Sequence, residues 1–133
     1  MGLDMYLRGE KYFWTDWEYP DRNKTEDGFK VTTHTLELGY WRKHPDLHGY
    51  IVQTFAEGKD ECQQIHLDTK QMQQIIEAIQ NGGLPHTEGF FFGHSDNDEA
   101  EKKAAIEIFQ TAIMWSSTKQ EHVSKDVYYQ ASW

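Results

Sequence analysis

Three consecutive phenylalanines, Phe90, Phe91 and Phe92, stand between Gly89 and Gly93 and constrain the fold of this chain more than any other feature. A phenylalanine side chain buries about 150–250 Å² when it packs, and burying it completely stabilises a fold by roughly 1.5–3 kcal/mol. Three adjacent rings in water would forgo most of that stabilisation. We therefore predict that this segment is a short strand or extended stretch, buried on both faces at the centre of the molecule.

Length and charge limit the classes of protein to which the chain can belong. Its 133 residues suit one domain, and its 14% aromatic content supplies a core. The net charge of −9 excludes a general affinity for nucleic acid, because phosphate binding requires a cationic face. A small basic pocket for an anionic ligand is still compatible with this charge, and so is an acidic surface that imitates DNA.

The cysteine content and the distribution of apolar residues predict a cytoplasmic protein. Cys62 is the single cysteine, which excludes an intramolecular disulfide framework and a multi-cysteine zinc site. Residues 1–7 lack the basic start and apolar run of a signal peptide. No run of about 18 apolar residues is present, so we expect no membrane-spanning segment.

Periodicity predicts an α+β fold in a single domain spanning residues 1–133. Alternating apolar residues predict strands, whereas apolar residues three and four apart predict helices. The interleaving of the two favours a mixed, mostly antiparallel sheet of about four to five strands with about three helices packed on it. Strands are predicted over 3–8, 29–40, 62–67, 89–93 and 127–133, and helices from Pro45 to a stop at Glu57-Gly58, from the Asp68-Thr69 cap to Asn81, and over 97–117.

Gly9 is expected to end the first strand. Two other segments leave alternatives open. Gly49 weakens the first helix by up to ~1 kcal/mol relative to alanine, so a strand over 50–55 competes with this helix. The stretch 10–28 mixes charged residues with five aromatic ones. We expect these aromatic residues to fold back as a lid on the core, with a ligand-binding surface as the alternative. If those at 12–19 are exposed, they favour a homodimer.

Several residue groups are candidates for a functional site, each with a structural alternative. Asp4 lies on the polar face of the first strand, where charged residues are most often simply solvated. Tyr40, Trp41 and Arg42 combine stacking surfaces with a cation, as anion and base recognition requires. The favoured interpretation of this run is structural, with Trp41 in the core and Arg42 and Lys43 in water.

The seven histidines raise the question of a metal site. His44 and His48 have the i, i+4 spacing of helical metal ligands, but Pro45 is expected to move His44 to the helix cap. His86 and His94, with Asp96 and Asp98, would converge only if the backbone folds back. We therefore predict no metal and no other cofactor.

The two flanks of the phenylalanine segment carry the remaining candidates. Thr87 and Glu88 precede it, whereas His94 and Ser95 follow it and open a helix, whose free N–H groups can receive an anion. Acidic residues at the start of that helix compete for the same donors, so a capped helix is the favoured interpretation. Cys62 and His66 would lie about 13 Å apart on a strand, too far to share a proton.

Four blocks of the sequence resemble a family of small phage and bacterial proteins of unknown function. They are residues 1–7, 37–43, 84–93 and 128–133. The resemblance covers most of the chain and implies association with a phage or prophage, but it transfers no activity, cofactor or catalytic residue.

Two functional hypotheses follow. The first is a protein that binds a host or phage protein, or a small anionic ligand, through Tyr40, Trp41, Arg42, His48 and the loops of Thr87 to Ser95. The second is a hydrolase-like enzyme with Asp4, His48, Glu88 or His94 as acid–base groups.

Overall fold

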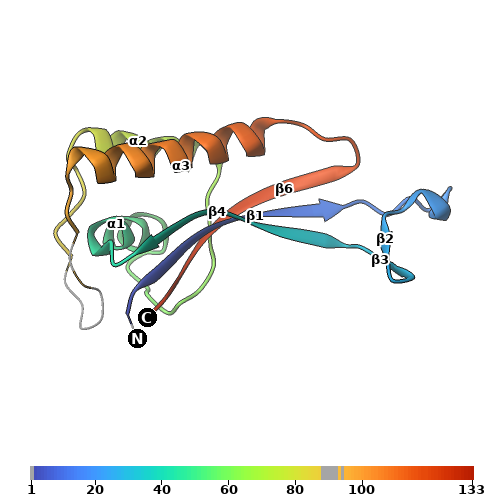
Figure 1. Ribbon diagram of the computed structural model, residues 1–133, viewed down its shortest axis with the longest axis horizontal. Coiled ribbons are helices and arrows are strands. Elements are labelled where there is room, and N and C mark those ends of the chain that lie inside the picture. Colours follow the sequence, from blue (N-terminus) through green and yellow to red (C-terminus); the bar gives the residue numbers. More distant parts are fainter. Residues whose placement is uncertain (1, 88–92, 94) are drawn as a thin grey trace.

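A four-stranded antiparallel sheet in the order β4-β1-β6-β5 organises the molecule (Figure 1). The computed structural model describes residues 2–87, 93 and 95–133, so the predicted burial of the three phenylalanines lies outside the described residues. Strand β1 (Asp4–Phe13) lies between β4 (Thr33–Arg42) and β6 (Val123–Ser132), and the short β5 (Ile65–His66) pairs with β6. The sheet brings both ends of the chain together, since Asp4 pairs with Ser132.

Strand β1 forms where the sequence alternates. Leu3, Met5 and Leu7 are completely buried, whereas the side chains between them are partly exposed. The expectation that Gly9 ends this strand is wrong, since β1 continues to Phe13. Gly9 instead makes room for Trp115, because a Cβ at this position would lie 2.7 Å from the indole ring.

Three helices pack on the sheet, and all three were predicted. They are α1 (Pro45–Phe55), α2 (Thr69–Gln80) and α3 (Glu99–Ser117). Helix α2 begins with a capping box, in which the Asp68 carboxylate accepts the Gln71 N–H and the Gln71 side chain accepts the Asp68 N–H. The competing strand over 50–55 is wrong, since Pro45 supplies a preformed first helical position and α1 continues through this stretch.

The hydrophobic core lies between the sheet and the helices. Helices α2 and α3 run side by side over one face of the sheet (Figure 1). Trp41 of β4 stacks on Phe109 of α3, with ring centroids 5.5 Å apart and planes inclined by 22°. The largest completely buried side chains are those of Tyr129, Phe109, Leu3, Met5, Leu7, Leu47, Ile51, Met72, Ile75, Ile76, Ile79 and His48.

Other strand boundaries also differ from the prediction. The strand expected over 29–40 is divided into β3 (Phe29–Lys30), which belongs to a separate two-stranded sheet, and β4, which continues to Arg42. Of the strand expected over 62–67, only β5 (Ile65–His66) forms, since Cys62 has a left-handed backbone with φ 57°. Strand β6 begins at Val123, four residues before the expected start, because these residues pair with the extended part of β1. The fold class is as predicted, a single α+β domain with three helices and an antiparallel four-stranded sheet.

A projecting arm, residues 14–32, joins β1 to β4 and extends beyond the helices (Figure 1). It contains a short 3-10 helix, η1 (Pro20–Arg22), and a small hairpin of β2 (Thr25–Glu26) and β3 (Phe29–Lys30). The expected lid over the core is wrong, because the arm extends away from the helices and its aromatic rings are exposed. Among the described residues, no helix combines the length and apolarity needed to cross a membrane.

Candidate functional site

A buried polar network surrounds the first turn of α1. His44 is the N-cap residue of this helix, as Pro45 at the next position led us to expect, and its imidazole Nδ1 lies 2.8 Å from the hydroxyl of Ser95. The Ser95 Oγ also accepts the backbone N–H of Asp46 at 3.1 Å. Both side chains are buried, so Ser95 caps a helix to which it does not belong.

The same imidazole connects α1 with α3. Nε2 of His44 lies 3.2 Å from the Glu101 carboxylate. Burial lowers the pKa of His44, while the carboxylates of Glu101, Asp46 and Asp96 act in the opposite direction. A neutral imidazole satisfies every contact, because Nδ1 can accept the Ser95 O–H and Nε2–H can donate to Glu101.

Asp46 fastens both flanks of the phenylalanine segment to α1. Its carboxylate accepts the Thr87 N–H at 2.9 Å and the Asn97 side-chain amide at 2.7 Å. His86 lies 4.0 Å from the same carboxylate and is an ion-pair partner when protonated. These contacts hold residues 86–87 and 95–97 against the first turn of α1. We use the name α1 clasp for the group formed by His44, Asp46, His86, Thr87, Ser95, Asn97 and Glu101.

Two glycines permit the close approach of these flanks. A Cβ at Gly49 of α1 would overlap the side chain of Thr87, and one at Gly93 would lie 2.8 Å from the side chain of Lys43. Thr87, Gly93 and Ser95, on the two flanks of the phenylalanine segment, therefore meet the junction of β4 and α1.

His48 belongs to a second buried chain of hydrogen bonds. Its Nδ1 lies 2.6 Å from the Tyr129 hydroxyl and its Nε2 lies 2.9 Å from the Asp60 carboxylate. The other oxygen of Asp60 accepts the Trp133 indole N–H at 3.2 Å. Burial, followed by the charge of Asp60, raises the pKa of Tyr129 well above its ordinary value.

The remaining described candidates lie on β1 and β4. Asp4 stands opposite Arg42 and accepts a hydrogen bond from the hydroxyl of Tyr40, which raises the pKa of Tyr40. Trp41 points to the other face, is 8% exposed and stacks in the core, so its ring does not belong to a contact surface. The structural interpretation of this run is confirmed, since Arg42 and Lys43 are exposed.

The sequence candidates thus do not form one described site. Asp4, Tyr40 and Arg42 meet on the sheet, and Thr87 and Ser95 meet on the α1 clasp, while His48 joins a different hydrogen-bonded chain. Glu88 and His94 lie outside the described residues. Within residues 2–87, 93 and 95–133, no three His, Cys, Asp or Glu side chains are grouped to hold a metal ion.

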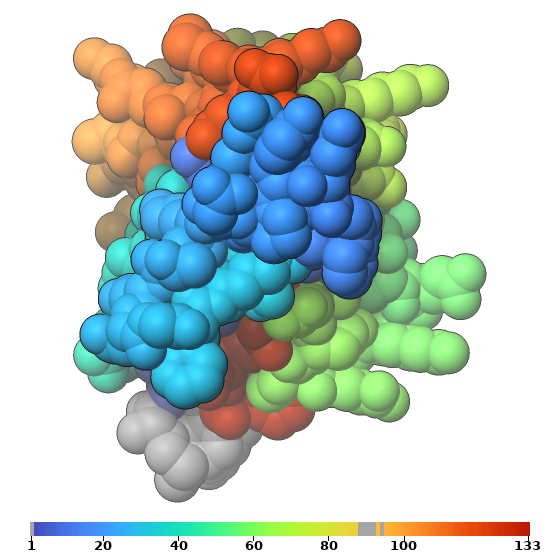
Figure 2. Space-filling model, turned by 90° about the vertical axis from the view of Figure 1, so that its right-hand side faces the viewer, coloured from blue at the N-terminus to red at the C-terminus, as the bar shows by residue number. Residues whose placement is uncertain are grey.

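Among the described residues, the most exposed aromatic side chains lie on the arm, where the sequence favoured a lid. Trp17 is 87%, Phe29 76% and Trp14 58% exposed. Figure 2 views the molecule from this end and shows the arm standing in front of the body. A cleft of about 680 Å³ lies between residues 13–24 and the turn at 120–123, and we call it the arm cleft.

Hydrogen bonds hold the arm cleft in one shape. The Asp16 carboxylate accepts the Tyr19 N–H at 2.7 Å, and the Asn23 side-chain oxygen accepts the Asp16 N–H at 2.7 Å. Trp14 is fixed at both its main chain and its ring, since its backbone N–H donates to the His122 carbonyl and its indole N–H to Ser124. The ring of Trp14 and the main chain of the turn at Asp16 to Tyr19 are therefore preorganised.

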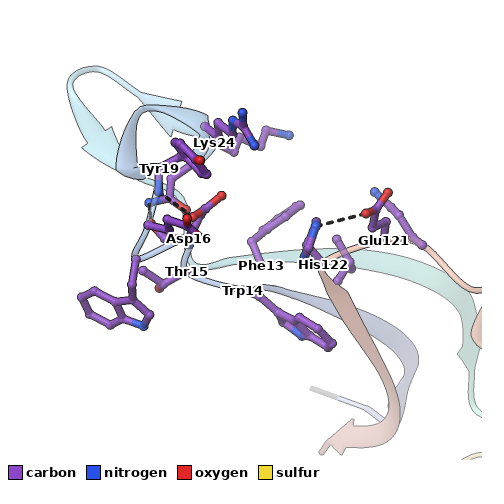
Figure 3. A pocket seen from close by; sticks show the side chains of 14 residues that line it. Phe13, Trp14, Thr15, Asp16, Tyr19, Lys24, Glu121 and His122 are labelled. Atoms are coloured by element: carbon purple, nitrogen blue, oxygen red, sulfur yellow. Dashed lines mark hydrogen bonds and ion pairs between the residues drawn. The ribbon is translucent and has the colours of Figure 1, made fainter.

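Charged side chains line both walls of the arm cleft (Figure 3). The Arg22 guanidinium lies 4.0 Å from the centre of the Tyr19 ring, and the Lys24 ammonium lies 5.1 Å from that of Phe13. On the opposite wall His122 lies 3.2 Å from Glu121. The cleft thus combines aromatic rings, two cations and several carboxylates.

One signal in the sequence could have identified this surface. Asp21 to Gly28 is an unbroken polar run directly after the aromatic residues, with the Asp27-Gly28 turn typical of a hairpin that projects into water. Both turn residues have positive φ, 52° and 82°.

No family model, curated protein or solved structure matches this chain.

Proposed function

We propose that the protein acts by binding another protein through the arm cleft and the aromatic rings around it. The observation that carries this proposal is the exposure of Trp17, Phe29 and Trp14 on one projecting arm. Tryptophan and tyrosine are the residues most enriched at the energetic centres of protein interfaces. A stable fold gains little from such rings in water, so their presence favours a contact made with a partner.

The order in the arm supports binding rather than a flexible connection. The hydrogen bonds of Asp16, Asn23 and Trp14 limit the conformational entropy that binding would remove. The binding hypothesis drawn from the sequence is thereby kept, but its contact surface moves from the Tyr40–Arg42 run to the arm. A host or phage protein as the partner is still a prediction.

Site-specific crosslinking tests this proposal. A photoreactive amino acid at Trp17 should give one discrete adduct in cells that naturally contain the protein. The same residue at Met114, which is 71% exposed on α3, is the control and should not give that adduct. Absence of an adduct at Trp17, or the same adduct at both positions, would contradict the proposal.

The α1 clasp supports a second candidate, the hydrolase-like enzyme. Ser95, His44 and Glu101 are joined in the order hydroxyl, imidazole and carboxylate, with distances of 2.8 and 3.2 Å. Such an order activates a serine nucleophile when the imidazole accepts the hydroxyl proton. Ser95 is only 6% exposed and caps α1, which favours the structural role.

A fluorophosphonate probe separates these two roles of Ser95. An activated serine reacts with this reagent, whereas a hydroxyl that only caps a helix does not. Labelling that disappears in Ser95→Ala and is kept in Ser116→Ala would favour the enzyme. We expect no labelling of Ser95 in the folded protein.

A further inference from the structure

We infer that the arm cleft receives a lysine or arginine side chain from an extended, positively charged segment of the partner protein. This inference rests on the proposed function and adds the chemistry of the partner. It follows from which aromatic rings of the cleft already carry a cation and from the negative charge around these rings.

The protein's own cations already occupy part of the cleft in this way. Arg22 covers Tyr19 and Lys24 covers Phe13, each within the distance at which a cation is attracted to a ring. In the described part of the chain, cations also lie over Tyr6 and Trp115, but none lies over Trp14 or Trp17. Indole rings are the strongest cation acceptors among side chains. The Trp17 ring is almost fully exposed, whereas the Trp14 ring is 58% exposed and has an edge contact with His122, so both leave ring surface for a cation from outside.

Carboxylates stand where such a cation would arrive. Glu18 and Glu121 line the cleft from its two walls, and both are exposed. The arm holds five acidic side chains, those of Asp16, Glu18, Asp21, Glu26 and Asp27, against the three basic ones of Arg22, Lys24 and Lys30. The cleft thus offers a partner cation both indole rings and carboxylates.

The charge of the whole protein favours the same occupant over its competitors. A net charge of −9 attracts a basic segment over several ångströms and repels an acidic one. A second copy of this chain would bring the same negative charge to the interface, so a homodimer is disfavoured. The lysine and arginine cations that line the cleft for an anionic ligand are Arg22 and Lys24, and their charges already lie over rings of the cleft.

Three synthetic nonapeptides test the inference. One consists of three Gly-Leu-Arg repeats, and the other two carry Gln or Glu in place of Arg. Binding is followed by fluorine NMR of protein labelled with 5-fluorotryptophan, in which Trp14→Phe and Trp17→Phe variants assign the two resonances. We expect the Arg peptide to shift both resonances and to bind at least about fivefold tighter than the Gln peptide. The Glu peptide should not bind.

Matched variants separate local from overall charge. Glu18→Gln with Glu121→Gln should weaken the Arg peptide by about fivefold, as expected for two exposed ion pairs. Glu77→Gln with Glu107→Gln removes the same charge from exposed positions on α2 and α3 and should leave the affinity within about twofold. Equal losses in both double variants would overturn the cleft as the site.

The outcomes also distinguish this inference from the proposed function. Equal binding of the three peptides, or preference for the Glu peptide, overturns the cationic partner. A Trp17 crosslink without any binding of the Arg peptide overturns the inference and leaves the proposed function intact. A crosslinked dimer, with the Trp17 resonance dependent on protein concentration, would show that a second copy fills the cleft and would likewise overturn the inference.

Discussion

The hydroxyl of Tyr129 and the Nδ1 atom of His48 lie 2.6 Å apart inside the protein, although 81 residues separate them in the chain. Because burial holds the pKa of Tyr129 well above its ordinary value, the phenol stays protonated and donates to the imidazole. Nε2–H of His48 then donates to Asp60. This chain ties α1 to β6 across the core, so its contribution to stability can be measured.

Replacing Tyr129 with Phe should lower the free energy of unfolding by about 1–3 kcal/mol. The substitution removes the donor and leaves the buried Nδ1 of His48 without that bond. Urea denaturation of the variant measures the loss. Tyr19→Phe, at an exposed ring on the arm, is the control and should change the stability by less than about 0.5 kcal/mol. Equal effects in the two variants would contradict a role for the His48 bond.

Replacing Gly49 with Ala should destabilise the protein by about 1–3 kcal/mol. Helix propensity alone predicts a gain of up to about 1 kcal/mol, but the new Cβ overlaps Thr87, a stiff β-branched side chain. Denaturation in a double-mutant cycle with Thr87→Gly gives the sign. The alanine should cost much less in the Thr87→Gly background, because the obstructing atoms are gone. A stabilised Gly49→Ala variant would show that residue 87 does not pack against α1.

Stability should fall as the pH decreases through the ordinary pKa of histidine, and His44 should account for part of the fall. Its pKa is lowered in the folded state, so below pH of about 6.5 the unfolded chain binds a proton that the folded protein does not. The free energy of unfolding then decreases by at most about 1.4 kcal/mol per pH unit for this group. Urea denaturation between pH 5 and 7.5 should give a shallower dependence for His44→Gln. An unchanged slope would contradict the burial of a neutral imidazole.

Removing the arm should leave the fold intact. In the variant, residues 14–31 are replaced by Asn-Gly, a two-residue turn that matches the twist of an antiparallel pair and suits Phe13 and Thr32, whose main chains are already hydrogen bonded. We expect the free energy of unfolding to stay within about 1–2 kcal/mol, since the deleted rings are mostly exposed. Circular dichroism during thermal unfolding checks this expectation. A variant that does not fold would mean that the arm serves the core.

The sequence predicted the local elements well. The helices over 45–55, 69–80 and 99–117 follow apolar spacing. Helices α2 and α3 begin at the N-cap residues Asp68 and Asp98, and each of these signals depends on residues within one or two turns. The alternation of buried and partly exposed side chains in β1 was predicted for the same reason. These features need only short-range information.

The candidate site was predicted only in fragments. Thr87 and Ser95 were named, but their common partner Asp46 lies in the first turn of α1, 41 and 49 residues away in the sequence. Asp60 and Tyr129 were not named as partners of His48, because no periodicity indicates which polar groups meet inside a fold. Which of these polar groups meet depends on how the strands and helices are arranged in the folded protein.

The chain alone determined its three helices, its alternating strands and its acidic, aromatic-rich character, since propensity, capping and periodicity act over a few residues. Burial was expected of Trp14, Trp17 and Trp41 alike, and only the tertiary structure decided that Trp14, Trp17 and Phe29 project into water. All four lie in similar aromatic and charged surroundings in the sequence. What separates them is whether a helix lies over that part of the sheet, because a ring can be buried only where another element covers it.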